Sequence, residues 1–255
     1  MAQTIAVAGK GGTGKTTFCG LLIDWMTKNG KSPVLAVDAD ANANLNEVLG
    51  VEVELTLGEI REVVAHADSD KGDIPSGMSK QDYMNDKFSS ALIEEDDFDM
   101  LVMGHTQGKG CYCFVNGLLQ TEIKKLEGNY RYMVVDNEAG MEHISRGILP
   151  SIDCLVLVSD CSRRGIQAVG RIAELAREMN IRPGKVALIV NRAPGGVLNP
   201  GTAEEIGRQG LELAGVIPQD ELLFEYDSYG KPTAYLPADS AAKKAVHEIV
   251  NKLFD

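Results

Sequence analysis

The residues with the clearest chemical meaning form a glycine-rich segment near the N-terminus, Gly9-Lys10-Gly11-Gly12-Thr13-Gly14-Lys15-Thr16. It lies between a strand-like run and a helical pattern, which is the setting in which such a loop binds phosphate. Glycines let the backbone N–H groups turn inward toward phosphate oxygens, and the helix N-terminus adds its positive dipole end. We expect Lys15 to bridge the β- and γ-phosphates and the Thr16 hydroxyl to ligate Mg²⁺. The predicted nucleotide-binding residues of this segment are Gly9, Gly11, Gly12, Thr13, Gly14, Lys15, Thr16 and Thr17.

Three aspartates follow apolar runs further along the chain. Asp136 ends the run Tyr132–Val135, a Walker B pattern in which a buried strand delivers one carboxylate to the outer sphere of the metal. Asp38 and Asp40 follow the run Pro33–Val37, at the strand edge where an open α/β sheet binds its ligand. The alternative for this second pair is ordinary helix capping.

Two further candidate ligands lie in the segment Cys111-Tyr112-Cys113. Two thiolates are half of a four-ligand site, and thiolates suit Zn²⁺, Ni²⁺, Cu(I) or an iron–sulfur centre. A symmetric dimer would supply the other two sulfurs on its two-fold axis. Two incidental cysteines beside a core helix and a redox dithiol are the alternatives.

The other cysteines have a simpler interpretation. The chain has five in all, and this odd number argues against a disulfide framework. Cys19 and Cys154 lie in apolar patterns, so we expect them to pack in the core.

The elements that would position these residues alternate along the chain. Strand-like apolar runs, rich in Val, Ile and Leu, are separated by helical patterns such as Thr16–Asn29 and Gln167–Met179, which favours a doubly wound, mostly parallel sheet flanked by helices. No repeat or low-complexity linker interrupts residues 1–255, so we expect one α/β P-loop NTPase domain. The predicted strands are Thr4–Ala8, Pro33–Val37, Met100–Met103, Tyr132–Val135, Cys154–Val158, Val186–Val190 and Leu213–Ile217.

Two segments lie outside this alternation. The polar region from Ile60 to Glu95 is expected to be an excursion from the sheet rather than a core element. The C-terminal stretch Ser240–Phe254 has apolar residues at helical spacing, which favours docking on the core over a helix at a membrane surface.

Charge and composition narrow the classes of partner. The net charge is −12 and the sequence has no basic cluster, so we expect no nucleic acid and no membrane as a partner. Met1 leads directly into a strand-like run, with no pattern of a secretory signal, which indicates a cytoplasmic protein.

The additional lysine in Lys10-Gly-Gly-Thr-Gly-Lys-Thr resembles the deviant Walker A ATPases, which include division-site and plasmid-partition ATPases and nitrogenase iron protein. This resemblance implies an ATP-dependent homodimer in which Lys10 reaches the nucleotide of the partner subunit. It also implies that Asp40 positions the attacking water, while Asp38 supports the magnesium shell. Lys10, Lys15 and Asp40 are thus the expected catalytic residues. Gly140 would sense the γ-phosphate, Asn191 would read adenine, and the loop around Pro218 would cover the base.

A finer resemblance is to the nickel-insertion ATPases that mature carbon monoxide dehydrogenase and acetyl-CoA synthase. It rests on the lysine-bearing loop, on Asp136-Asn-Glu-Ala-Gly-Met-Glu-His, and on Cys-x-Cys followed by Asn-x-Leu-Leu. It implies that Cys111 and Cys113 of two subunits hold Ni²⁺ (or Zn²⁺) for a client nickel enzyme. The chain departs from the wider deviant Walker A pattern at Ala41, and from this finer pattern at Phe114, where prolines are common. An iron–sulfur carrier and a positioning ATPase remain the alternatives.

Overall fold

Eight strands form one sheet in the computed structural model, which describes residues 2–67, 74, 75, 77–105, 113–139, 149 and 151–254. The strand order is β3-β4-β2-β5-β1-β6-β7-β8, and every neighbouring pair is parallel except β3 and β4. The strands are β1 (Gln3–Gly9), β2 (Val34–Ala39), β3 (Ile93–Glu94), β4 (Phe98–Val102), β5 (Tyr132–Asn137), β6 (Cys154–Asp160), β7 (Lys185–Ala193) and β8 (Leu213–Pro218). The predicted doubly wound sheet is therefore confirmed.

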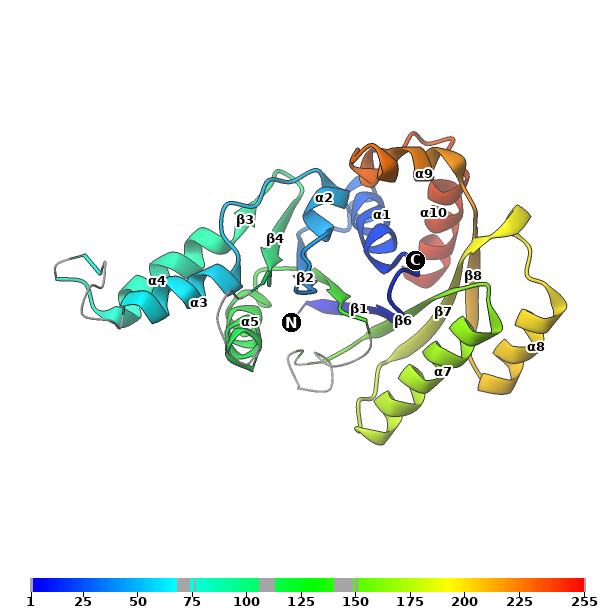
Figure 1. The fold of residues 1–255 in the computed structure, drawn as a ribbon, viewed down its shortest axis with the longest axis horizontal. Coiled ribbons are helices and arrows are strands. Elements are labelled where there is room, and N and C mark those ends of the chain that lie inside the picture. Colours follow the sequence, from blue (N-terminus) through cyan, green and yellow to red (C-terminus); the bar gives the residue numbers. More distant parts are fainter. Residues whose placement is uncertain are drawn as a thin grey trace.

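Helices cover both faces of this sheet (Figure 1). Helices α1 and α10 pack on one face, whereas α5, α7 and α8 pack on the other. The α-helices are α1 (Lys15–Lys28), α2 (Leu45–Leu49), α3 (Leu57–Ala67), α4 (Lys80–Ala91), α5 (Cys113–Leu126), α7 (Arg163–Glu178), α8 (Pro200–Gln209), α9 (Glu221–Ser228) and α10 (Ala241–Phe254), and the 3₁₀ turns are η1 (Pro194–Gly196) and η2 (Thr233–Tyr235). In the described part of the chain, no helix combines the length and apolarity that crossing a bilayer requires.

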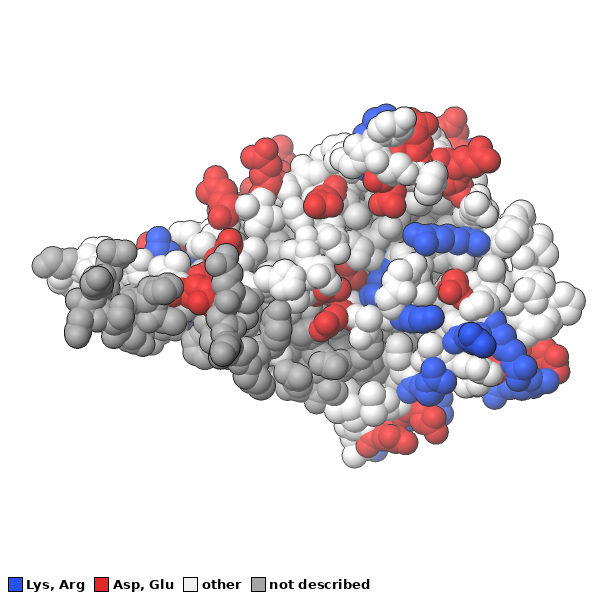
Figure 2. All heavy atoms as spheres, viewed as in Figure 1, with Lys and Arg blue, Asp and Glu red and all other residues white. Residues whose placement is uncertain are grey.

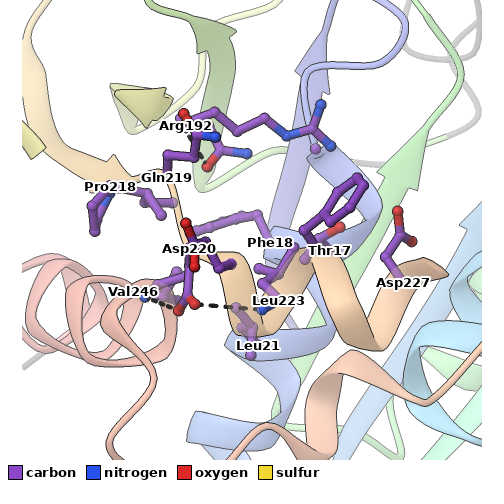
Figure 3. Close-up of a pocket in the computed structure, with 16 residues that line it drawn as sticks. Thr17, Phe18, Leu21, Arg192, Pro218, Gln219, Asp220, Leu223, Asp227 and Val246 are labelled. Atoms are coloured by element: carbon purple, nitrogen blue, oxygen red, sulfur yellow. Dashed lines mark hydrogen bonds between the residues drawn. The ribbon is translucent and has the colours of Figure 1, made fainter. Parts of the chain in front are cut away.

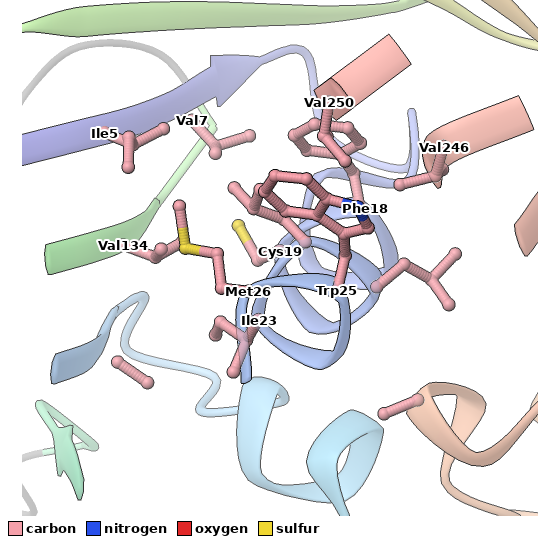
Figure 4. Packing of buried hydrophobic residues seen from close by; sticks show 14 of the residues in the cluster. Ile5, Val7, Phe18, Cys19, Ile23, Trp25, Met26, Val134, Val246 and Val250 are labelled. Carbon is pink, nitrogen blue, oxygen red and sulfur yellow. The ribbon is translucent and has the colours of Figure 1, made fainter. Parts of the chain in front are cut away.

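The central strand β1 shows why the strands are apolar without alternation. Ile5 and Val7 contribute to the core beneath α1, while Ala6 and Ala8 face α7, and all four are fully buried. Figure 4 shows side chains of α1, among them Cys19, packed between the strands and α10. Burial raises the pKa of the Cys19 thiol well above its ordinary value, so this cysteine is a neutral packing group, as predicted.

All seven predicted strands are present, and each has at least one end displaced from the predicted position. The eighth strand, β3, was not predicted because two residues at an antiparallel edge leave no periodic signal. Helix α1 ends before Gly30, whose φ of 68° gives the left-handed stop expected there.

The polar region from Ile60 to Glu95 is an excursion only in part. Helices α3 and α4 project beyond the sheet, at the left of Figure 1. However, Leu57, Ile60, Phe88 and Ala91 are buried in the core that α5 forms over β2 and β5. The prediction that this region contributes no core element was wrong, because a few widely spaced apolar residues among polar ones suffice to anchor two amphipathic helices.

The C-terminal helix α10 docks on the core, as expected. Ala242, Val246, Ile249 and Val250 are buried together with residues of α1 and β8. Lys243 is also buried, and its Nζ lies 2.9 Å from Asp24 Oδ2 while donating to the carbonyls of Ala234 and Leu236 at 2.8 Å each. This buried ion pair joins α1, α10 and the turn η2.

Candidate functional site

The phosphate loop connects β1 to α1 with a backbone that only glycine accommodates at two points. A Cβ on Gly9 would lie 2.2 Å from the Val158 carbonyl oxygen of β6. Gly14 has φ 92°, and a Cβ there would lie 2.3 Å from the amide of Asn191. The sequence therefore fixes a tightly packed loop, as the predicted motif requires.

The lysine and threonine of the loop are held from within it. Lys15 is buried, with 7% of its surface exposed, and its Nζ lies 3.5 Å from the Lys10 carbonyl oxygen. The Thr13 hydroxyl donates to the same carbonyl at 2.9 Å. The Lys15 ammonium is thus weakly bound to the protein, which leaves its charge available to a phosphate.

Strand register brings the two predicted metal carboxylates together. Asp38 of β2 pairs with Asp136 of β5, so their side chains point to the same side of neighbouring parallel strands. Both are essentially fully buried. Asp38 accepts from the backbone N–H groups of Asp40 and Leu45, at 3.0 and 2.9 Å.

This proximity changes their protonation. Burial raises the pKa of Asp136 to about 7, and repulsion from Asp38 adds to this, although a hydrogen bond from Thr16 and the charge of Lys15 act in the opposite direction. Burial likewise raises the pKa of Asp38 to about 6, against the two backbone hydrogen bonds. The pair therefore favours a nearby cation.

The residues present fit a magnesium ion. Within the part of the chain that the structure describes, the buried Asp136 Oδ1 has no hydrogen-bond partner, so it can accept from a donor such as a metal-bound water. Thr16 and Asp40 line the same cavity of about 480 Å³, together with Lys15. Mg²⁺ binds oxygen ligands and keeps several waters, which matches a hydroxyl flanked by outer carboxylates.

Asp40, the residue predicted to position the attacking water, lines the phosphate cavity. Its Oδ1 accepts from the backbone and side-chain nitrogens of Asn42, at 2.9 and 3.0 Å. The carboxylate lines the phosphate cavity, as does Glu138, which the sequence analysis did not single out. Ala41, in place of a proline, is nearly buried, with 9% exposed.

A second cavity of about 750 Å³ adjoins the loop and is largely apolar on its inner side (Figure 3). Phe18 and Leu21 of α1, Leu223 of α9 and Val246 of α10 line it. Pro218 lies at its edge, where the family resemblance placed the loop that covers the base. An apolar cavity of this size beside a phosphate loop suits a purine.

Asn191 lines this cavity as well, and it also braces the loop. Its Nδ2 donates to the Thr13 carbonyl at 2.9 Å, and its Oδ1 accepts from the Arg192 backbone N–H at 2.8 Å. Each of these atoms retains a second hydrogen-bonding position for a base. Asn191 thus contacts both the phosphate loop and the larger cavity.

Four residues line both cavities: Gly14, Thr17, Arg192 and Asp227. Arg192 and Asp227 were not predicted as site residues, because they come from β7 and α9, far along the chain from the motif. The only sequence signal was the position of Arg192 immediately after Asn191. Asp220 was also missed as a structural group: it caps α9 and accepts from Ser240 Oγ and the Ala242 N–H at 2.6 and 2.9 Å.

Some predicted residues lie elsewhere or cannot be placed. Lys10 is exposed at the rim of the loop. Cys111 and Gly140 lie outside the described residues, and of Cys113 only its position as the first residue of α5 is described. Among the described residues, no group of three or more His, Cys, Asp or Glu side chains could hold a metal ion.

Basic side chains gather on one half of the face seen in Figure 2, over α7 and α8, although the sequence shows no basic cluster. One arginine of α7 and one of α8 share a buried carboxylate, since Arg163 Nε lies 2.8 Å and Arg208 Nη1 3.4 Å from Glu205 Oε2. Part of this positive charge is therefore paired within the chain.

Comparisons with known proteins agree with this geometry. The model of the CobQ/CobB/MinD/ParA nucleotide binding domain family matches residues 4–233. An uncharacterized ATP-binding protein of Methanocaldococcus jannaschii is 40% identical over 98% of both chains. The carbon monoxide dehydrogenase accessory protein CooC of Rhodospirillum rubrum is 29% identical, over 89% of this chain and 87% of its own. The septum site-determining protein MinD of Pyrococcus horikoshii, solved with Mg-ADP, shares the fold with a TM-score of 0.74 and 22% identity, covering 100% of this chain and 97% of its own.

Proposed function

Because the chain belongs to the CobQ/CobB/MinD/ParA family of nucleotide-binding domains and is a P-loop ATPase, we propose that it uses ATP to deliver nickel to a client metalloenzyme. The client would be carbon monoxide dehydrogenase or acetyl-CoA synthase. Nickel is the cargo in this proposal, and ATP with Mg²⁺ drives its release.

The observation that carries the nucleotide-binding part of the proposal is the pairing of the buried Asp38 and Asp136 next to Thr16 and Lys15 of the phosphate loop. Mg²⁺, when bound, would neutralise phosphate charge. Lys15 would neutralise the transferred phosphoryl group, Asp136 and Asp38 would help to hold the ion, and Asp40 would orient the attacking water. Each of these groups lines the phosphate cavity or lies directly behind it.

The metal half is supported by the thiolate pair and by the relationship to CooC. Cys113 is the first residue of α5, and thiolates are ligands that suit nickel. The carbonyl of Asp38 accepts from the Met103 N–H at 2.9 Å, and Met103 begins the connection that runs from β4 toward the cysteines.

A homodimer would complete both the metal site and the nucleotide site. Two thiolates per chain need a second copy to form a four-sulfur site. Lys10 is exposed at the rim of the loop, where a partner's nucleotide could meet it. The proposed cycle is thus binding of ATP, closure of the dimer, capture of nickel by four thiolates, and its release to the client after hydrolysis.

Native mass spectrometry of the full chain with Ni²⁺ and a non-hydrolysable ATP analogue tests this proposal. We expect a dimer that contains one nickel and two nucleotides. Cys113→Ser should lose the nickel and keep both nucleotides. Cys161→Ser is the matched control, because this thiol is half-buried at the end of β6 and lies on neither cavity lining.

Nickel retained by Cys113→Ser would overturn the shared-thiolate site. An anaerobic preparation with the visible absorption of an iron–sulfur cluster on the same cysteines would favour the cluster carrier instead. ATP-dependent cosedimentation with DNA or liposomes, without metal binding, would favour a positioning ATPase.

A further inference from the structure

Arg192 has a backbone conformation that non-glycine residues rarely adopt. Its φ is 55°, and the pairing of β7 with β8 shifts register between Val190 and Ala193, around this residue. A side chain in the left-handed region is strained and is retained where the surroundings require it. Asn191 fixes this conformation by accepting the Arg192 N–H at 2.8 Å.

The Arg192 side chain lies against the phosphate loop. Arg192 Nη1 donates to the Gly12 carbonyl at 3.2 Å, while the neighbouring Asn191 binds the Thr13 carbonyl. Figure 3 shows Arg192 on the opposite side of the base cavity from Leu21. Arg192 is exposed, and within the described part of the chain its guanidinium forms no ion pair.

The two cavities meet at the residues that line both, Gly14, Thr17, Arg192 and Asp227. A nucleotide with its base in the larger cavity and its β- and γ-phosphates against Lys15 must pass its ribose and α-phosphate through this junction. Among these four residues Arg192 is the one cation. A guanidinium with one bond to a neutral carbonyl keeps further N–H donors for an anion.

We propose that Arg192 is a nucleotide-binding residue that donates to the α-phosphate in its own subunit. It thereby aligns the phosphate chain with Lys15 and Thr16 while the bond to Gly12 keeps the loop in shape. This role differs from that of Lys15, which acts on the β- and γ-phosphates. The inference rests on the nucleotide half of the proposed function and is independent of the metal half.

A series of ligands of increasing phosphate number tests the assignment. We expect Arg192→Ala to weaken AMP, ADP and a non-hydrolysable ATP analogue by a similar factor, about tenfold, the size of a lost charge-assisted hydrogen bond. Adenosine, measured by competition, should bind within about twofold of wild type. Arg192→Lys keeps the charge without the planar guanidinium, so its affinities for the phosphate-bearing ligands should lie between those of the wild type and Arg192→Ala.

Arg171→Ala is the matched control, because this exposed arginine of α7 lines neither cavity and its replacement should leave all four affinities unchanged. Equal weakening of adenosine would overturn the inference in favour of a purely structural role. Weakening of the ATP analogue alone would overturn it in favour of a γ-phosphate contact. Wild-type protein that binds none of the phosphate-bearing ligands would overturn the ATPase assignment and this inference with it.

Discussion

In the absence of a cation, the buried carboxylates Asp38 and Asp136 lower the free energy of unfolding. The size of this effect depends on pH. An unfolded Asp136 loses its proton near pH 3.8, whereas burial holds its folded pKa at about 7. Between these values the folded chain binds more protons, so the free energy of unfolding falls as pH rises through this window and levels off above it. The same reasoning applies to Asp38, up to about pH 6.

We therefore expect Asp136→Asn to stabilise the nucleotide-free protein at pH 8 by ~2 kcal/mol and to have little effect near pH 4. Thermal unfolding between pH 4 and pH 8 measures this difference. Mg²⁺ and ADP should reverse the order at pH 8, since the metal favours the charged carboxylate that the variant lacks. A stability difference that does not change with pH would contradict the assigned cause.

At this scale, the sequence predicted the residues whose chemistry depends on local spacing. Lys15, Thr16, Asp38 and Asp136 all lie on the phosphate cavity or directly behind it, because a strand end and a following loop fix their positions. Arg192 and Asp227 could not be predicted in the same way. They join the site only through the pairing of β7 with β8 and the packing of α9, which are contacts between distant segments.

At the scale of elements, helix α10 is held by a buried ion pair as well as by its apolar face. Asp24 accepts from Lys28 at 2.5 Å and lies 2.9 Å from Lys243 Nζ. Burial alone would raise the pKa of Asp24, but Lys28, Lys243 and the imidazole of His247, whose Nε2 lies 3.6 Å from Asp24 Oδ2, lower it to about 2. This contribution to stability is therefore present above about pH 4 and is lost only as pH falls toward 2.

Lys243→Met should lower the free energy of unfolding by ~3 kcal/mol, because it removes one partner of a buried pair and leaves two carbonyls without their donor. Lys244→Met is the control at the adjacent, exposed position, and its effect should stay within about 0.5 kcal/mol. Chemical denaturation at pH 7 measures both. Equal effects of the two variants would mean that the pair adds nothing to docking.

Helices were predictable where apolar residues recur at regular spacing, as in α7 and α10. In α3 the helical spacing of Leu57, Ile60 and Val64 carries the same signal, which the sequence analysis passed over, whereas in α4 mostly polar residues surround a few buried ones. What decides that region is contact with α5 and with the loop after β4, where Gly58 N–H donates to the Met103 carbonyl at 2.8 Å. Tertiary contact of this kind leaves no periodic signal in the sequence.

At the scale of the whole molecule, charge opposes the proposed dimer. Each chain carries a net charge of −12, and bound nucleotide makes it more negative. Two copies therefore repel each other at long range, and salt screens this repulsion. Closure thus requires positive groups at the interface itself. Lys10 is the candidate, because it is exposed beside the phosphate loop while Lys15 is buried within the subunit.

Lys10→Ala should therefore bind ATP with near wild-type affinity but fail to dimerise on it, since the lost charge acts on the partner's nucleotide. Sedimentation velocity with a non-hydrolysable analogue measures the dimer, and the same titration at higher salt should strengthen the wild-type dimer by screening the long-range repulsion. Lys10→Arg, which keeps the charge, should retain part of the dimerisation. Normal dimers in Lys10→Ala would show that closure depends on other contacts, and a strictly monomeric wild-type protein with saturating nickel and nucleotide would remove the shared site altogether.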